Sequence, residues 1–183
     1  MTTSETRPGR KKGPWRRGIE GVGVLAALFG LLIVARMVLT PWDLPLPGKP
    51  RLTGYWQGEV SYTADDRRRL MLHLVNDNNC SLACDVTGEV KVCGAAKDTS
   101  GEFAGDVHNW SGSRFSLELY LPTRKADINM RELDGEWDGD VIRMKTKVDV
   151  INADGTWSSN HQMPDPPMFE MRRAGEADFE AAC

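Results

Sequence analysis

Residue types that carry catalysis are scarce in this chain and do not form a known catalytic pattern. The three histidines, His73, His108 and His161, occur singly and far apart in the sequence. No serine lies within the glycine pattern of a nucleophile elbow, and no group of carboxylates has the spacing of a metal site. We therefore expect that the chain is not an enzyme and that it binds neither a cofactor nor a metal ion.

Cysteine is almost as rare, with four residues: Cys80, Cys84, Cys93 and Cys183. The spacing Cys-x3-Cys-x8-Cys lacks the paired Cys-x2-Cys knuckles of structural zinc sites, which argues against zinc. Four cysteines allow three full pairings, and the sequence does not separate them. If the domain faces an oxidising compartment, we expect at least one bridge within the Cys80–Cys93 cluster, with Cys183 either tying down the C-terminal tail or remaining free.

Basic residues are concentrated at one end of the chain. The formal net charge of -3 hides a block of six Lys and Arg residues between Arg7 and Arg17, whereas the C-terminal stretch EADFEAAC is acidic. Because the basic block is a short flank of an apolar segment and not one face of a folded domain, it does not indicate a nucleic-acid partner.

The apolar segment after this block is the longest in the chain, and its centre, Gly21 to Ala35, carries no charge. Its length approaches the roughly 20 residues that a helix needs to cross a bilayer. We expect a transmembrane α-helix over residues 18–40 that contacts the lipid bilayer, with Trp15 and Trp42 as aromatic-belt residues. A cleaved signal peptide and a buried core helix are the alternatives, but no small-x-small cleavage site follows the segment.

The excess of Lys and Arg before the apolar segment predicts a cytoplasmic N-terminus, according to the positive-inside rule. The chain would then be a single-pass protein of the cell membrane with an extracytoplasmic C-terminal domain. Four prolines in residues 40–50 indicate a stiff, extended spacer. The expected division is a basic cytoplasmic tail (1–17), a transmembrane helix (18–40), a Pro-rich spacer (41–51), a β-barrel domain (52–175) and an acidic tail (176–183).

From Leu52 onward, apolar and polar residues alternate in short runs. In VIRMKTKVDVI, for example, Ile142, Met144, Thr146, Val148 and Val150 fall on one face. Such a period of two is typical of antiparallel strands with one buried face. RLMLHLV and RFSLELYLP show the same pattern, and weaker runs are Tyr55–Thr63, Val86–Val92, Glu102–His108, Asn129–Trp137, Thr156–Ser159 and Met168–Arg173. We expect an all-β fold of about eight or nine strands. An up-and-down barrel is favoured over a sandwich, because closure removes exposed edges.

A Gly-x-aromatic-x-Gly motif occurs three times in this region. Its members are Gly54, Trp56 and Gly58; Gly101, Phe103 and Gly105; and Gly135, Trp137 and Gly139. Glycine allows a strand to bend or another backbone to approach closely, and the aromatic side chain between two glycines can pack inside a barrel. We interpret the motif as structural packing and not as a set of ligand contacts.

The first motif, Gly54-Tyr55-Trp56 on the first strand of an antiparallel meander, resembles the calycin group of barrels, the lipocalins and avidin-like proteins. This resemblance covers roughly Leu52 to Arg173 and implies a closed barrel whose interior could bind a small ligand. Lipocalins also add a C-terminal helix, for which EADFEAA is a short candidate. In layout, the chain is also similar to membrane-anchored β-barrel effectors of bacterial cyclic-oligonucleotide defence systems, although these have two membrane helices and a cytosolic barrel.

Two functions therefore remain open for the barrel domain. It could bind a small or lipidic, hydrophobic ligand, or it could be a structural or interaction domain that packs against another protein of the cell envelope. An apolar cavity with a few polar groups would favour the first function, and a core filled by large side chains would favour the second.

Overall fold

The computed structural model describes residues 14–39, 41–43, 50–61, 67–76, 85–94, 98–122, 127–151, 153–159 and 168–183. Contacts divide the chain into two compact units, Met1–Leu39 and Thr40–Cys183.

Helix α1 (Pro14–Leu39) forms the first unit. Proline suits the first helical position, where its missing N–H would have no partner, and helices usually end before the residue that precedes a proline, here Thr40. Large apolar side chains of α1, among them Leu25, Phe29 and Leu31, are exposed. In the part of the chain that the structure describes, no helix is found with the length and hydropathy needed to cross a membrane. The transmembrane assignment therefore stays a prediction.

The second unit contains nine strands, as the alternating runs predicted. They are β1 (Gly54–Ser61), β2 (Arg67–Asn76), β3 (Val86–Cys93), β4 (Thr99–Val107), β5 (Arg114–Tyr120), β6 (Asp127–Asp138), β7 (Val141–Ile151), β8 (Trp157–Ser159) and β9 (Met168–Arg173).

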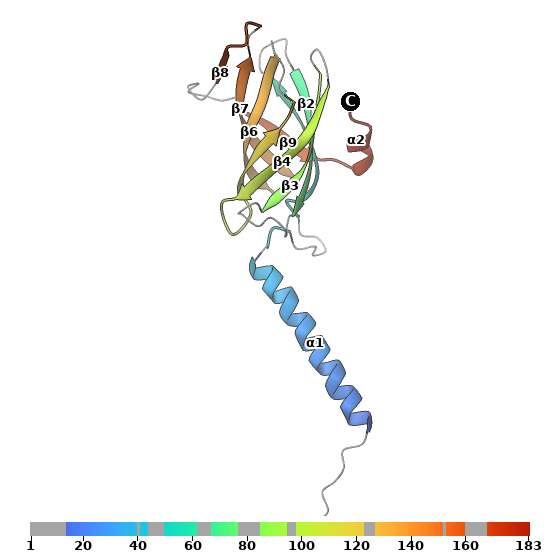
Figure 1. Ribbon diagram of the computed structural model, residues 1–183. Helices are drawn as coiled ribbons and strands as arrows, with labels where there is room; N and C mark the ends of the chain where they lie inside the picture. Colours follow the sequence, from blue (N-terminus) through green and yellow to red (C-terminus); the bar gives the residue numbers. More distant parts are fainter. Residues whose placement is uncertain are drawn as a thin grey trace, which may run out of the picture. The chain divides into compact units, whose positions relative to one another are not determined.

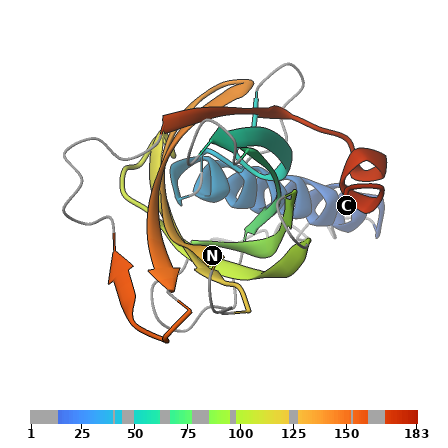
Figure 2. The same ribbon diagram turned by 90° about the horizontal axis from the view of Figure 1, so that it is seen from above.

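Eight of these strands close into an antiparallel barrel. Each of β1 to β7 pairs with its neighbour in the sequence, β9 pairs with β7, and β9 also pairs with β1, which completes the ring. The closed ring is visible from above in Figure 2. Strand β8 pairs with the C-terminal end of β7 and is not part of the ring (Figure 1). The predicted up-and-down β-barrel of about eight strands is therefore confirmed. A closed antiparallel barrel of eight strands is compatible with a calycin-like fold.

The core occupies the inside of the barrel, and the period-two pattern identified it correctly. Leu70, Leu72 and Leu74 on β2 are at most 1% exposed, and Ile142 and Met144 on β7 are fully buried. Burial of each large aliphatic side chain stabilises the fold by about 1.5–3 kcal/mol.

Trp42 belongs to this core, so the interpretation of Trp42 as an aromatic-belt residue is wrong. Its exposure is 4%, and its carbonyl oxygen accepts a hydrogen bond of 3.1 Å from the Leu52 amide. The Asp43 carboxylate next to it accepts hydrogen bonds from Thr53 (2.9 Å) and Asn76 (2.7 Å). The first residues of the predicted spacer are thus packed against the barrel. Residues 44–49, and the side chain of Trp15, lie outside the described residues.

A short helix, α2 (Glu176–Glu180), follows β9 and lies outside the ring of strands (Figure 2). Its Phe179 is 1% exposed and clusters with Met71 on the outer wall of the barrel. A disulfide joins Cys93 at the end of β3 to Cys183. The segment predicted as an acidic tail therefore contains a helix that is packed and covalently tied to the barrel. We call residues 174–183 the C-terminal strap.

Candidate functional site

The interior of the barrel is the first place to look for a binding site, and its described part is filled by side chains. Twelve residues of the core cluster have no accessible surface at all: Leu52, Trp56, Val60, Leu70, Leu72, Val86, Val90, Leu117, Leu133, Ile142, Met144 and Met171. A side chain next to a water-sized cavity would keep some accessible surface. The described core is therefore closely packed around these twelve side chains.

Trp56 closes this core near one end of the barrel. Its indole Nε1 donates a hydrogen bond of 2.8 Å to the carbonyl oxygen of Leu52, so the polar end of the ring is satisfied although the residue is fully buried. The guanidinium of Arg173 lies 3.9 Å from the centre of the Trp56 ring, a cation–π geometry. Arg173 also donates a hydrogen bond of 2.8 Å to the Thr53 carbonyl oxygen. These contacts join the last barrel strand to the first.

Arg173 remains a cation in this position. Burial lowers the pKa of its guanidinium to about 10, while the nearby carboxylate of Asp140, at 4.0 Å, acts in the opposite direction. A pKa of about 10 still leaves the group charged at neutral pH. We therefore assign Trp56 and Arg173 to the closure of the barrel and not to chemistry.

The other members of the glycine motif are placed on separate strands. Phe103 is buried on β4, between Gly101 and Gly105. Trp137 is half-buried near the end of β6, and its Nε1 donates a hydrogen bond of 2.6 Å to the carbonyl oxygen of Gly139. The aromatic residues of the three motifs lie on β1, β4 and β6, so the motifs do not form one site.

Two glycines of these motifs have clear local roles. The ring of Phe115 packs directly on Gly135, where a Cβ atom would overlap it. Gly139 has a φ of +65° in the two-residue turn between β6 and β7, which is the conformation that glycine favours in a tight hairpin. Both roles are structural.

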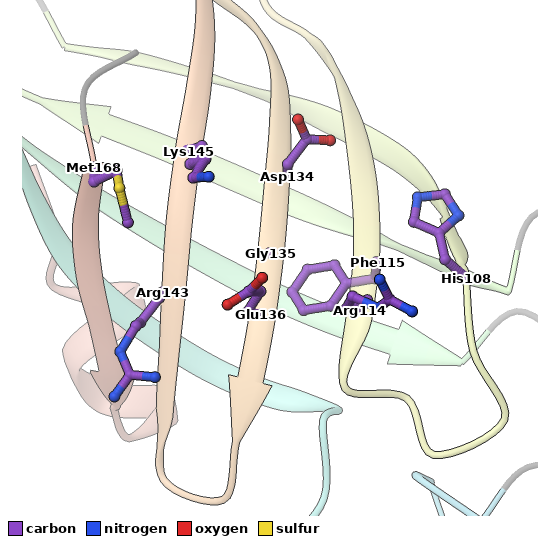
Figure 3. A pocket seen from close by; sticks show the side chains of 9 residues that line it. All are labelled: His108, Arg114, Phe115, Asp134, Gly135, Glu136, Arg143, Lys145 and Met168. Carbon is purple, nitrogen blue, oxygen red and sulfur yellow. The ribbon is translucent and has the colours of Figure 1, made fainter. Parts of the chain in front are cut away.

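A groove on the outer wall of the barrel, lined by described residues, is a candidate binding surface (Figure 3). We call it the outer groove. Its volume is about 250 Å³, and its lining comes from β5, β6, β7, β9 and the turn before β5: His108, Arg114, Phe115, Asp134, Gly135, Glu136, Arg143, Lys145 and Met168. Ligand pockets usually measure about 300–1,000 Å³, so the groove suits a side chain or short segment of a partner better than a free small molecule.

Charges of opposite sign alternate across the outer groove. Arg114 lies opposite Glu136 in the strand register, Glu136 lies opposite Arg143, and Arg143 lies opposite Glu170. Arg143 Nε and Glu170 Oε1 are separated by 3.9 Å. Alternating charges stabilise neighbouring strands, but they also present a polar surface with a defined pattern.

Next to the groove, Lys147 lies 2.6 Å from Glu132 and 3.9 Å from Asp134. The hydrogen bond to Glu132 raises the pKa of the Lys147 ammonium, so this lysine is charged at neutral pH. The carboxylate of Asp134 therefore lines the groove and also lies near the Lys147 ammonium group. This pairing limits the negative potential that the groove presents.

The C-terminal strap covers a second part of the outer wall. Lys91 Nζ donates a hydrogen bond of 2.8 Å to the Phe179 carbonyl oxygen and lies 4.5 Å from the centre of the Phe179 ring. Beside it, the rings of Tyr55 and His73 stack with their centroids 4.2 Å apart. Desolvation, followed by the nearby Glu176, raises the pKa of Tyr55. The contacts between Lys91 and Phe179 therefore hold the strap against this part of the outer wall.

The expectations for cysteine and histidine are partly met. Cys183 ties down the tail, as one of the two alternatives predicted, but its partner is Cys93. Cys80 and Cys84 lie outside the described residues, so a further bridge in the Cys80–Cys93 cluster stays a prediction. His73 contacts Tyr55, His108 lines the outer groove, and His161 is not described. Within the described ranges, no group of three or more His, Cys, Asp or Glu residues is arranged to hold a metal.

Sequence reasoning missed three residues of these sites. Arg173 was not assigned to the interior, although it follows Phe169 and Met171 at a period of two and the alternation places it on the inward face. Trp42 gave no periodic signal because it stands in a turn. Phe179 is the only aromatic residue of the acidic tail, which is the one clue to its burial.

Comparison of the chain with protein-family models, with curated proteins and with solved structures finds no match in any of the three.

Proposed function

We propose that this chain is a membrane-anchored, extracytoplasmic interaction domain of a cell-envelope complex. The observation that carries this proposal is the packed interior of the barrel. A carrier of small or lipidic ligands needs internal space, and the twelve fully buried core residues leave none beside them. The outer wall is then the surface available for binding a partner.

The anchor part of the proposal rests on α1 and its flanks. Large apolar side chains of α1 are 41–74% exposed, so the unit offers an apolar surface that a bilayer would cover. The basic block before it predicts a cytoplasmic N-terminus. The Cys93–Cys183 bond favours an oxidising compartment for the barrel, in contrast to the cytosolic barrel of the cyclic-oligonucleotide effectors.

The partner surface that we propose is the outer groove. It combines exposed cations at Arg114, Arg143 and Lys145 with carboxylates at Asp134 and Glu136. The exposed Met168, at 59%, adds an apolar contact at its edge. Such a surface fits a protein segment with both acidic and basic residues, because each of its charges can find an opposite charge in the groove.

Photocrosslinking of the full chain in membranes of its native host tests this surface. A photoreactive amino acid at Lys145 should give one covalent adduct of defined mass, and the Arg143→Glu change should suppress it. The same amino acid at Glu102, an exposed position on β4 outside the groove, is the matched control and should give little adduct. If no position in the groove gives an adduct, and the purified chain carries a stoichiometric small molecule instead, the ligand-carrier function is correct.

Fusions after Arg173 test the orientation separately. A reporter enzyme that is active only outside the cytoplasm should be active there, and a reporter that requires the cytoplasm should be inactive. The reverse result would contradict the extracytoplasmic barrel and favour the effector alternative.

A further inference from the structure

Among the residues of the barrel unit whose side chains the structure describes, Trp110 is the most exposed large apolar one. Its exposed fraction is 68%, compared with 42% for Val75, 59% for Met168 and 56% for Tyr120. It lies in the turn between β4 and β5, residues 108–113. Burying a tryptophan removes more apolar surface from water than burying most other residues, so the exposed part of this side chain is a candidate contact surface.

The turn that carries Trp110 is held in one conformation by its own polar groups. The Gly112 amide donates to the Asn109 carbonyl oxygen (3.0 Å), the Asn109 side-chain amide donates to Ser113 Oγ (2.8 Å), and the Arg114 amide donates to Asn109 Oδ1 (3.1 Å). Gly112 has a φ of +75°. The indole is therefore presented by an ordered turn.

This turn lies at the end of the barrel where the chain enters. Gly112 packs so closely on Trp42 that a Cβ atom at Gly112 would overlap the Trp42 side chain. Residues 41–43 and the β4–β5 turn are seen at the same end of the barrel in Figure 1. Helix α1 ends at Leu39, and Pro41 is already buried. The covalent link alone keeps the Trp42 Cα within about 11 Å of the Leu39 Cα, whatever orientation the two units take.

We propose that the β4–β5 turn is a membrane-contact loop, in which Trp110 enters the interface of the bilayer that holds α1. This inference rests on the proposed anchor. A bilayer interface extends only about 5–7 Å beyond the hydrocarbon on each side, and tryptophan is enriched there because its ring is apolar and its N–H can meet headgroups. The link between Leu39 and Trp42 is short enough to allow this contact.

The contact is apolar in character and not electrostatic. Exposed carboxylates at the same end, on Asp85, Asp138 and Asp140, accompany the exposed cations Arg51 and Arg114. Among the described residues named here, the cations do not outnumber the carboxylates, so they form no basic patch for anionic lipids. The contact should therefore form on zwitterionic phosphatidylcholine and persist at high salt.

Fluorine NMR of the full chain in phosphatidylcholine nanodiscs tests the proposal. All six tryptophans are labelled as 5-fluorotryptophan, and the Trp110→Phe change assigns the Trp110 resonance. Spin-labelled lipid should broaden this resonance beyond detection, and a water-soluble gadolinium chelate should leave it largely unchanged. The buried Trp56 resonance should respond to neither reagent.

A second variant moves the indole from this turn to the far end of β5. It combines Trp110→Phe with Tyr120→Trp, since Tyr120 is 56% exposed and lies about 20 Å further along β5. Its new resonance should respond only to the gadolinium chelate.

The Trp15 resonance reports the anchor in the same spectra, because Trp15 lies in α1. If spin-labelled lipid broadens Trp15 while Trp110 responds only to the chelate, the membrane-contact loop is refuted and the anchor stands. If neither responds to the lipid, both are refuted.

Discussion

At the scale of single residues, the barrel depends on a few contacts that join its first and last strands. Trp56 on β1 is fully buried, and the cation of Arg173 on β9 covers its ring at 3.9 Å. Hydrogen bonds from both side chains end on backbone carbonyl groups of the segment before β1, at Leu52 and Thr53. These residues therefore fix the closure of the ring and the position of the entering chain together.

The first prediction concerns the loss of Trp56. Trp56→Ala should lower the free energy of unfolding of the isolated Thr40–Cys183 unit by about 3–5 kcal/mol, the range for emptying a large aromatic site in a core. Trp110→Ala is the matched control and should cost about 1 kcal/mol or less, because Trp110 is 68% exposed. Urea unfolding of both variants measures the difference. Equal costs would mean that Trp56 does not close the barrel.

Gly135 gives a second prediction at this scale. Gly135→Ala places a methyl group against the Phe115 ring and should destabilise the unit by about 1–3 kcal/mol through overpacking. Combining it with Phe115→Leu should cost less than the sum of the two single changes, because the smaller side chain gives the methyl group room. A double-mutant cycle measured by urea unfolding tests this coupling. Strict additivity would show that the two sites do not touch.

At the scale of elements, the strands were predictable and the short docked segments were not. A strand such as β7 can be recognised in the sequence because apolar and polar residues alternate along it, and every second side chain enters the core. Helix α2 has only five residues, too few for a periodic pattern, and Trp42 stands in a turn. Their burial depends on tertiary contacts with Met71 and Gly112, which no local pattern encodes.

The same reason limits the prediction of the candidate site. The outer groove combines residues from four strands, and its shape depends on the strand register. The sequence predicted which of these side chains face outward, as for Arg143 and Lys145. It did not predict which of them become neighbours.

The C-terminal strap yields a third prediction. Cys183→Ser should leave the strands intact but speed hydrogen exchange in residues 174–183, because a helix this short is marginal without its tether. The loop closed by the bond spans 90 residues, for which the chain-entropy model gives a loss of roughly 4–5 kcal/mol in unfolding free energy. Exchange measured by mass spectrometry and urea unfolding tests both effects. Unchanged exchange in the strap would show that Phe179 and Lys91 hold it without the disulfide.

At the scale of the whole molecule, a closed barrel with a packed interior is combined with an apolar helix. The ring of the barrel contains eight strands, and buried side chains from all of them pack inside it in the part of the chain that the structure describes. Its distinctive features, the outer groove, the strap and the exposed Trp110, all lie on the outside. This arrangement supports the proposal that the chain binds a partner on its outer surface.

The most direct test of this account is a binding titration on the isolated Thr40–Cys183 unit with a fluorescent fatty acid and, separately, with benzene. Wild type should show no saturable binding of either probe. Leu117→Ala is the positive control, because removing this fully buried side chain should open an apolar cavity that accepts benzene. Stoichiometric binding of the fatty acid to wild type, weakened by a bulkier residue at Val90 inside the barrel, would contradict the packed interior and the interaction-domain function with it.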